Sequence, residues 1–112
     1  MINNVFDKNL PILFLTNIQS FGKNSTTDKT AQCEGILDVN NIEIAVFTET
    51  WLCNITKDQL PFKDYIKYHL RKNCLRPSGG VSVFVKDSIK SSKLNLDVPE
   101  HLECLWVSAR PK

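Results

Sequence analysis

Two polar side chains that could bind a metal ion follow two apolar runs of the sequence. Asn17 ends the run 11–17, and Glu49 comes directly after the run 42–48. Ligands of open parallel sheets bind beyond the carboxyl ends of the strands, so both side chains reach one crevice if the runs are neighbouring strands. Mg²⁺ prefers one or two carboxylates completed by water and substrate phosphate. Glu49 with Asn17 therefore predicts a partial magnesium site, and the alternative is a solvated Glu and a turn-forming Asn.

The segments around these two residues predict a strand, a helix and a second strand. Continuous apolar runs such as 11–17 and 42–48 are typical of strands that are buried on both faces. The polar stretch 19–28 predicts a loop, and a helix begins near Asp28 with its apolar residues on one face. Asn40 and Asn41 can end that helix, because Asn tolerates a left-handed conformation. This order is typical of a parallel strand pair joined by a right-handed crossover.

The second half of the chain predicts three more strands, at 65–71, 81–86 and 102–110. The last of these alternates, so that Glu103, Leu105, Val107 and Ala109 share one face. A helical turn is favoured at 57–62. The segments 73–80 and 87–92 are turn-rich or polar and predict connections.

Composition limits the broad class of the protein. A chain of 112 residues with 42% apolar residues predicts one small domain, with residues 1–11 loose. The formal charge of +2 neither marks a nucleic-acid binder nor excludes one. The four cysteines lack the short spacing of zinc sites, which predicts free thiols in a reducing compartment. With no signal peptide and no membrane-length apolar run, we expect a soluble intracellular protein, in the nucleus or the cytoplasm.

Four short sequence motifs occur in order between about residues 13 and 111: LTNIQS (15–20), TETWL (48–52), GGVSVFV (79–85) and LECLWV (102–107). Together with Arg71 before the glycines, they resemble the endonuclease/exonuclease/phosphatase superfamily. The resemblance is strongest to the N-terminal part of non-LTR retrotransposon endonuclease domains, which are associated with reverse transcriptases.

The resemblance implies an α/β fold, the N-terminal half of a four-layer sandwich with a mixed sheet, and hydrolysis of phosphodiester bonds in DNA. Glu49 would be the metal ligand for Mg²⁺, or for Mn²⁺ in its place, and Asn17 would orient the metal site or the scissile phosphate. Arg71 would contact phosphate, with a solvated surface arginine as an equal alternative. Tyr65 and Tyr68 lie near the place of an active-site tyrosine, although packing is the favoured role for both. The resemblance implies no membrane association and defines no protein partner.

The chain also departs from the family pattern. Its 112 residues contain no Gly-Asp-Phe-Asn-like motif and no Ser-Asp-His-like motif. His69 and His101 lie in other contexts, which favour a structural role and a surface turn. We therefore expect a truncated, metal-dependent endonuclease-like domain that is inactive alone, because the general base and the phosphate-binding His act as a unit with the metal site.

Two alternatives remain beside the truncated endonuclease. One is a non-enzymatic retroelement relic or binding fragment. The other, an unrelated nucleotide-binding protein, lacks any glycine-rich phosphate motif. Half a sandwich would leave one sheet face and an edge strand uncovered, so the isolated chain is expected to be marginally stable or to aggregate.

Overall fold

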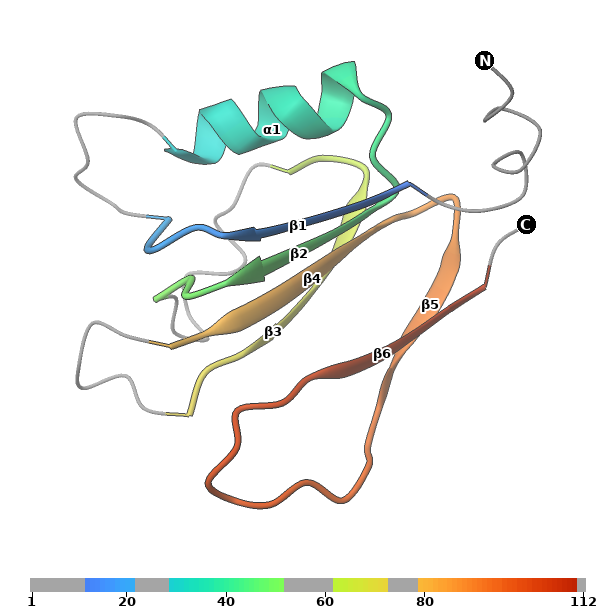
Figure 1. The fold of residues 1–112 in the computed structure, drawn as a ribbon. Coiled ribbons are helices and arrows are strands. Elements are labelled where there is room, and N and C mark those ends of the chain that lie inside the picture. The colour runs from blue at the N-terminus through green and yellow to red at the C-terminus, as the bar shows by residue number, and fades with distance from the viewer. Residues whose placement is uncertain (1–11, 22–28, 52–61, 73–78, 111–112) are drawn as a thin grey trace, which may run out of the picture.

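The computed structural model describes residues 12–21, 29–51, 62–72 and 79–110. Within these ranges the chain forms one helix and six strands (Figure 1). In chain order they are β1 (Leu13–Asn17), α1 (Lys29–Val39), β2 (Ile44–Thr48), β3 (Tyr65–Leu70), β4 (Val81–Lys86), β5 (Lys90–Leu94) and β6 (Trp106–Arg110). The protein is therefore a mixed α/β fold, as the sequence predicts.

The first four strands form one mixed sheet in the order β1-β2-β4-β3. Strands β1 and β2 are parallel, which confirms the pair predicted from their apolar runs and the intervening helix. Strand β4 is antiparallel to both β2 and β3. Strands β1, β2 and β3 consequently point the same way, and their carboxyl ends share one edge with the start of β4. We call this the carboxyl edge and define it as residues 17–21, 48–51, 70–72 and 79–81.

Helix α1 covers one face of this sheet over an aromatic core (Figure 1). Cys33 and Leu37 are its buried residues. Beneath them lie four buried phenylalanines, Phe21, Phe47, Phe62 and Phe84. The closest ring pair, Phe62 and Phe84, has centroids 4.7 Å apart. Because burial disfavours the thiolate, the pKa of Cys33 is raised, an effect that nearby Lys29 partly offsets.

The opposite face of the sheet is covered by β5 and β6, which pair with each other in a separate two-stranded sheet. Val83, Val85 and Ile89 form the core there. The β6 side contributes Leu105, Val107 and Ala109, which confirms the face predicted from their alternation. The molecule thus has three layers: helix, four-stranded sheet and two-stranded sheet (Figure 1).

The prediction of a wholly uncovered sheet face is wrong. Residues of β2, β3 and β4 all pack against the core that includes β6. The predicted burial of β1 on both faces is also wrong, because Leu13 is 60% and Leu15 is 66% exposed. These two side chains alternate with Phe14, which packs into the aromatic core on the other face.

Several predicted boundaries differ from the structure. Strand β5 lies largely in a segment predicted as a polar connection, and β6 begins at Trp106 rather than at residue 102. The predicted loop 19–28 contributes the buried core residue Phe21, while 22–28 lies outside the described residues. The predicted helical turn at 57–62 also lies outside them, apart from the buried Phe62. Asn41 has a φ of 52°, as its predicted place at the helix end requires.

Helix α1 has 11 residues, and the described part of the chain contains no helix long and apolar enough to cross a membrane.

Candidate functional site

The three residues predicted for the site reach the same edge of the sheet. Asn17 is the last residue of β1 and pairs with Thr48, so Glu49 follows one position beyond this pair. Arg71 follows the end of β3. Because β1, β2 and β3 run in the same direction, all three residues lie at the carboxyl edge. Asn17 is exposed, whereas Glu49 and Arg71 are half-buried.

The carboxylate of Glu49 is held by two N–H donors. Its Oε1 accepts a hydrogen bond from the indole Nε1 of Trp51 at 3.2 Å and another from the amide of Gly79, also at 3.2 Å. Trp51 lies two residues after Glu49 in the same segment, and Gly79 lies just before β4. Among the described contacts, none is a hydrogen bond between Glu49 and Asn17. The structure therefore brings the two residues to one edge without joining them directly.

The backbone around Glu49 is strained. Glu49 and Trp51 have φ values of 55° and 58°, a region that costs a non-glycine residue about 1–3 kcal/mol. Between them, the fully buried Thr50 donates its N–H to the carbonyl of Gly80 at 3.2 Å. The N–H of Trp51 donates to the carbonyl of Gly79 at 2.9 Å. Such strain persists only where neighbouring contacts hold it, and it clusters at functional sites.

The segment after β1 is tied to the same turn. The amides of Ser20 and Phe21 donate to the carbonyls of Glu49 and Thr50 at 2.7 and 3.1 Å. At the start of α1, Lys29 donates its Nζ to the carbonyls of Ile18 at 3.0 Å and Gln19 at 2.8 Å. Sequence reasoning did not place this cation at the carboxyl edge, because nothing in the spacing shows where the side chain of a helix start will reach.

Arg71 contacts the backbone rather than projecting freely from the edge. Its Nη1 donates a hydrogen bond to the carbonyl of Trp51, which ties the end of β3 to the strained segment after β2. Arg71 is thus a structural contact of the edge, and its predicted role toward phosphate stays a prediction.

A second carboxylate at this edge was missed by sequence reasoning. Glu103, in the segment between β5 and β6, accepts hydrogen bonds from the amides of Gly80 at 2.5 Å and Lys72 at 2.8 Å. The Nζ of Lys72 donates in turn to the carbonyl of Glu100 at 2.6 Å. The alternation around Glu103 predicted a strand, and no local pattern could link it to residues 72 and 80.

The histidines and tyrosines differ in burial and in the contacts that they make. His69 is 7% exposed and shares a hydrogen bond of 2.8 Å between its Nδ1 and the Ser82 hydroxyl, which agrees with a structural role. His101 is exposed in a turn, as predicted. The hydroxyl of Tyr68 bonds that of Ser91 at 2.8 Å, which agrees with packing between the two sheets.

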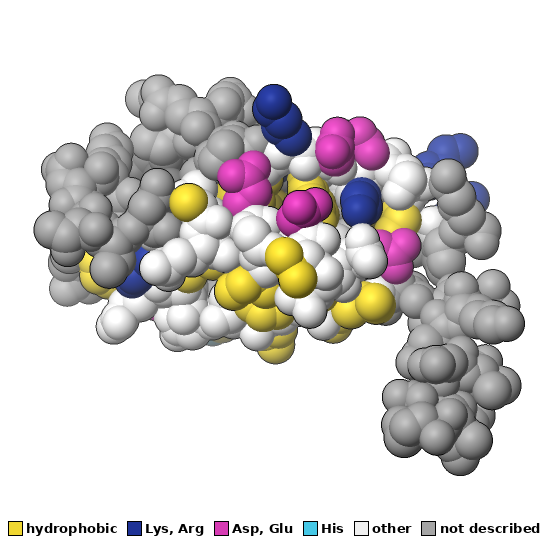
Figure 2. Space-filling view, turned by 90° about the horizontal axis from the view of Figure 1, so that it is seen from above, with side chains coloured by type: hydrophobic (Ala, Val, Ile, Leu, Met, Phe, Trp, Pro, Cys, Tyr) yellow, Lys and Arg dark blue, Asp and Glu magenta, His cyan; other side chains and the backbone are white. Residues whose placement is uncertain are grey.

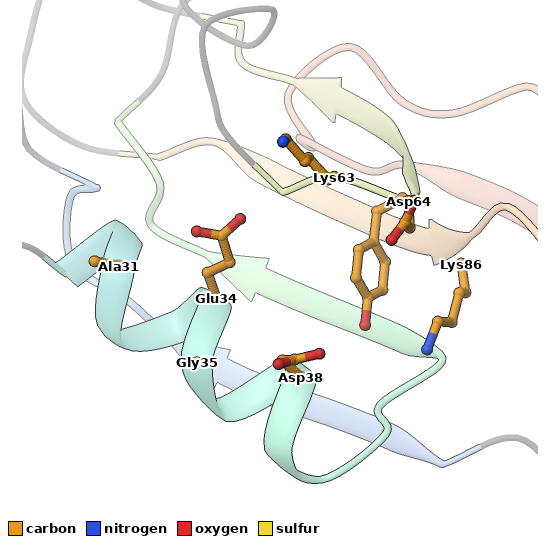
Figure 3. A pocket seen from close by; sticks show the side chains of 8 residues that line it. Ala31, Glu34, Gly35, Asp38, Lys63, Asp64 and Lys86 are labelled. Atoms are coloured by element: carbon orange, nitrogen blue, oxygen red, sulfur yellow. The ribbon is translucent and has the colours of Figure 1, made fainter.

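Tyr65 lies at the opposite edge of the sheet, where its hydroxyl donates to the carbonyl of Ile42. Burial raises the pKa of Tyr65, and the negative charges of Asp38, Asp64 and Glu43 raise it further. Next to it, between α1 and the sheet, is a hollow of about 400 Å³ (Figure 3). Its lining residues are Ala31, Glu34, Gly35, Asp38, Lys63, Asp64, Tyr65 and Lys86.

Charges of both signs are mixed over the α1 side of the molecule (Figure 2). In the hollow, Glu34 and Asp38 come from the helix, whereas Lys63 and Lys86 come from the sheet side (Figure 3). The register places this hollow at the far end of the strands from Glu49, since Tyr65 pairs with Lys86 and Leu70 with Val81. It is therefore a separate feature from the carboxyl edge.

The donor set at the carboxyl edge suits only a metal that brings its own additional ligands. Among the described residues, no group of three or more His, Cys, Asp or Glu side chains could hold a metal ion. Glu49 supplies one carboxylate and Asn17 one amide oxygen, while both oxygens of Glu103 accept backbone N–H bonds. One carboxylate with water and substrate phosphate is a set that Mg²⁺ accepts. The residues present fit such a partly hydrated ion.

Comparisons with protein-family models and with curated proteins find no match to this sequence.

Proposed function

We propose that the carboxyl edge is the metal-binding part of a phosphodiester-cleaving site of the endonuclease/exonuclease/phosphatase type, of retroelement origin, with DNA as its substrate. The observation that carries the proposal is the position of Glu49 beside Asn17 at the carboxyl ends of two parallel strands. The strained backbone on both sides of Thr50 supports it, because such strain is retained where a site requires it. The resemblance of the four sequence motifs to those of the endonuclease/exonuclease/phosphatase superfamily supports the assignment to this reaction class.

The proposed roles follow from the contacts at the edge. Glu49 holds Mg²⁺, or Mn²⁺, through its carboxylate, while Trp51 and Gly79 fix the direction of that carboxylate. Asn17 orients the metal site or the scissile phosphate, and Arg71 contacts phosphate. The bound ion supplies polarisation of the phosphoryl oxygen and stabilisation of the leaving oxygen.

The proposed fold is the N-terminal half of a four-layer sandwich. In this proposal, α1 is one outer layer, the sheet β1-β2-β4-β3 is the first inner layer, and β5 with β6 begins the second inner layer. The three described layers and the exposed leucines of β1 are consistent with it.

The proposed site is incomplete within these 112 residues. Neither the motif that supplies a water-activating Asp nor the one that supplies a phosphate-binding His occurs in the sequence. Since a general base and the groups that stabilise the transition state act together, removing part of the set costs most of the rate. The proposal is therefore metal binding without appreciable turnover.

A titration with Mn²⁺, followed by the electron paramagnetic resonance signal of the free ion, tests the proposed ligand. Glu49→Gln keeps an oxygen for Trp51 and Gly79 but removes the charge, so we expect the affinity to fall by about tenfold or more. Glu34→Gln, in the separate hollow, is the matched control and should leave the affinity unchanged. Equal Mn²⁺ affinity in the wild-type protein and in Glu49→Gln would refute the assignment of Glu49 as ligand.

A nicking assay on supercoiled plasmid tests the claim of incompleteness. With Mg²⁺ and the wild-type chain, we expect no nicking above a protein-free control. Clear nicking that disappears in Glu49→Ala would show that the chain contains a working catalyst, contrary to the proposal.

A non-enzymatic relic or binding fragment is the second candidate function. One observation favours it: Glu49, Arg71 and Glu103 all form hydrogen bonds within the protein, as purely structural residues would. This candidate predicts that the wild-type chain binds no Mn²⁺ and that Glu49→Gln changes only the stability of the fold.

A further inference from the structure

Glu103 joins three parts of the chain that are distant in sequence. It lies in the segment between β5 and β6, and its carboxylate spans the end of β3 and the start of β4. Oε2 accepts the N–H of Lys72 across 31 positions of sequence, and Oε1 accepts the N–H of Gly80 across 23 positions. The Nζ of Lys72 also donates a hydrogen bond to the backbone carbonyl of Glu100, which is a second contact between the same segments.

This carboxylate is one residue away from the contact that holds Glu49. Gly80 donates its N–H to Glu103, and the preceding Gly79 donates its N–H to Glu49 at 3.2 Å. The two glycines have φ values of 78° and 96°, so they form a turn that presents successive amides to two different carboxylates. A Cβ built on Gly79 would lie 3.1 Å from Oε1 of Glu103, which shows how closely the carboxylate packs on this turn.

We propose that Glu103 is a positioning residue for Glu49. By accepting the amides of Gly80 and Lys72, it fixes the two-glycine turn against the end of β3, and the turn fixes the Glu49 carboxylate through Gly79. Hydrogen bonds from amides to a carboxylate are among the strong ones in proteins. The two bonds to Glu103 therefore hold the turn rigidly. The inference rests on the proposed metal-binding role of Glu49.

Glu103 acts through the turn and not as a second ligand. Each of its two oxygens already accepts a backbone N–H, and turning either toward a metal would leave that amide without its acceptor. The arrangement resembles the outer contacts of metal sites, in which a partner orients the residue that binds the ion.

The test compares Glu103→Gln with Asp97→Asn in a ¹⁵N-labelled full chain. In Glu103→Gln, we expect the amide signals of Gly80 and Lys72 to shift directly. The signals of the Gly79 amide and the Trp51 indole N–H should shift as well, because their acceptor on Glu49 has moved. Mn²⁺ affinity should fall by about tenfold. Asp97→Asn alters an exposed carboxylate of the same segment and should change none of these values.

The possible results separate the positioning role from the proposed function. If Gly80 and Lys72 shift while Gly79, the Trp51 indole and Mn²⁺ affinity stay unchanged, the positioning role is wrong. If the wild-type chain binds no Mn²⁺, the proposed function fails, and the signals of Gly79 and Trp51 still decide the positioning role. Should Glu103→Gln not fold, Glu103→Asp takes its place: a side chain one methylene shorter cannot reach both amides, and the same signals are expected to shift.

Discussion

Gly80 shows at the residue scale why the carboxyl edge has the sequence it has. Its φ is 96°, which side chains rarely adopt, and a Cβ would overlap the hydroxyl of the fully buried Thr50. The same Cβ would lie 3.1 Å from the amide nitrogen of Trp51. Only glycine lets β4 begin this close to the strained segment that carries Glu49.

Gly80→Ala should therefore destabilise the protein by about 2–4 kcal/mol, from backbone strain together with the overlap at Thr50. Gly35→Ala is the control. Gly35 is in α1 and has nothing within 4 Å of an added Cβ, so we expect a gain of about 0.5–1 kcal/mol from helix propensity. Urea denaturation followed by circular dichroism measures both changes. Equal stability of Gly80→Ala and the wild-type protein would contradict the described packing.

At the scale of elements, the sequence predicts β1, β2 and β4 because each is an apolar run. The apolar pattern of α1 is weaker, since only Cys33 and Leu37 are buried and Ile36 is 40% exposed. The apolar runs of β2 and β4 coincide with packing in the two cores, whereas of the apolar residues of β1 only Phe14 packs against a core. Strand β5 (KSSKL) has no such pattern. Four of its five residues are polar, and none of the five is buried. Its position depends on the ladder with β6 and on the bond between Ser91 and Tyr68, and local sequence does not record such contacts.

The candidate site likewise has a part that the sequence predicts and a part that it does not. The rule that ligands bind at the carboxyl ends of parallel strands was enough to bring Asn17 and Glu49 to one edge. The other contacts of the edge are tertiary hydrogen bonds. They join Arg71 to the Trp51 carbonyl, Lys29 to the Ile18 carbonyl, and Glu103 to the Gly80 amide. They could not be predicted, because each joins residues from different elements whose relative placement depends on the whole fold.

At the scale of the whole molecule, β1 stands out as the exposed part of the sheet. Leu13 and Leu15 project from the face that β5 and β6 cover elsewhere. Strand β1 is also at one end of the strand order within the described sheet, so its outer backbone groups lack a described partner strand. An apolar edge strand of this kind favours association between chains.

We expect the wild-type chain to self-associate with rising concentration in sedimentation velocity, and Leu15→Lys to reduce that association because a lysine on an edge strand disfavours edge pairing. Val39→Lys is the control, since Val39 is 79% exposed on α1, which covers the face of the sheet opposite Leu15. A wild-type chain that stays monomeric at every concentration and melts cooperatively would count against an uncovered β1 and against the proposed half-sandwich.

The claim that Glu49 marks a metal site is tested most directly by locating bound Mn²⁺. In a ¹⁵N-labelled wild-type chain, trace Mn²⁺ broadens the amide signals nearest to the ion. We predict that the signals of Asn17, Glu49 and Gly79 broaden first, and that Glu49→Gln abolishes this order. Broadening centred instead on Glu34, Asp38 and Asp64, the carboxylates of the hollow at the opposite edge, would contradict the account.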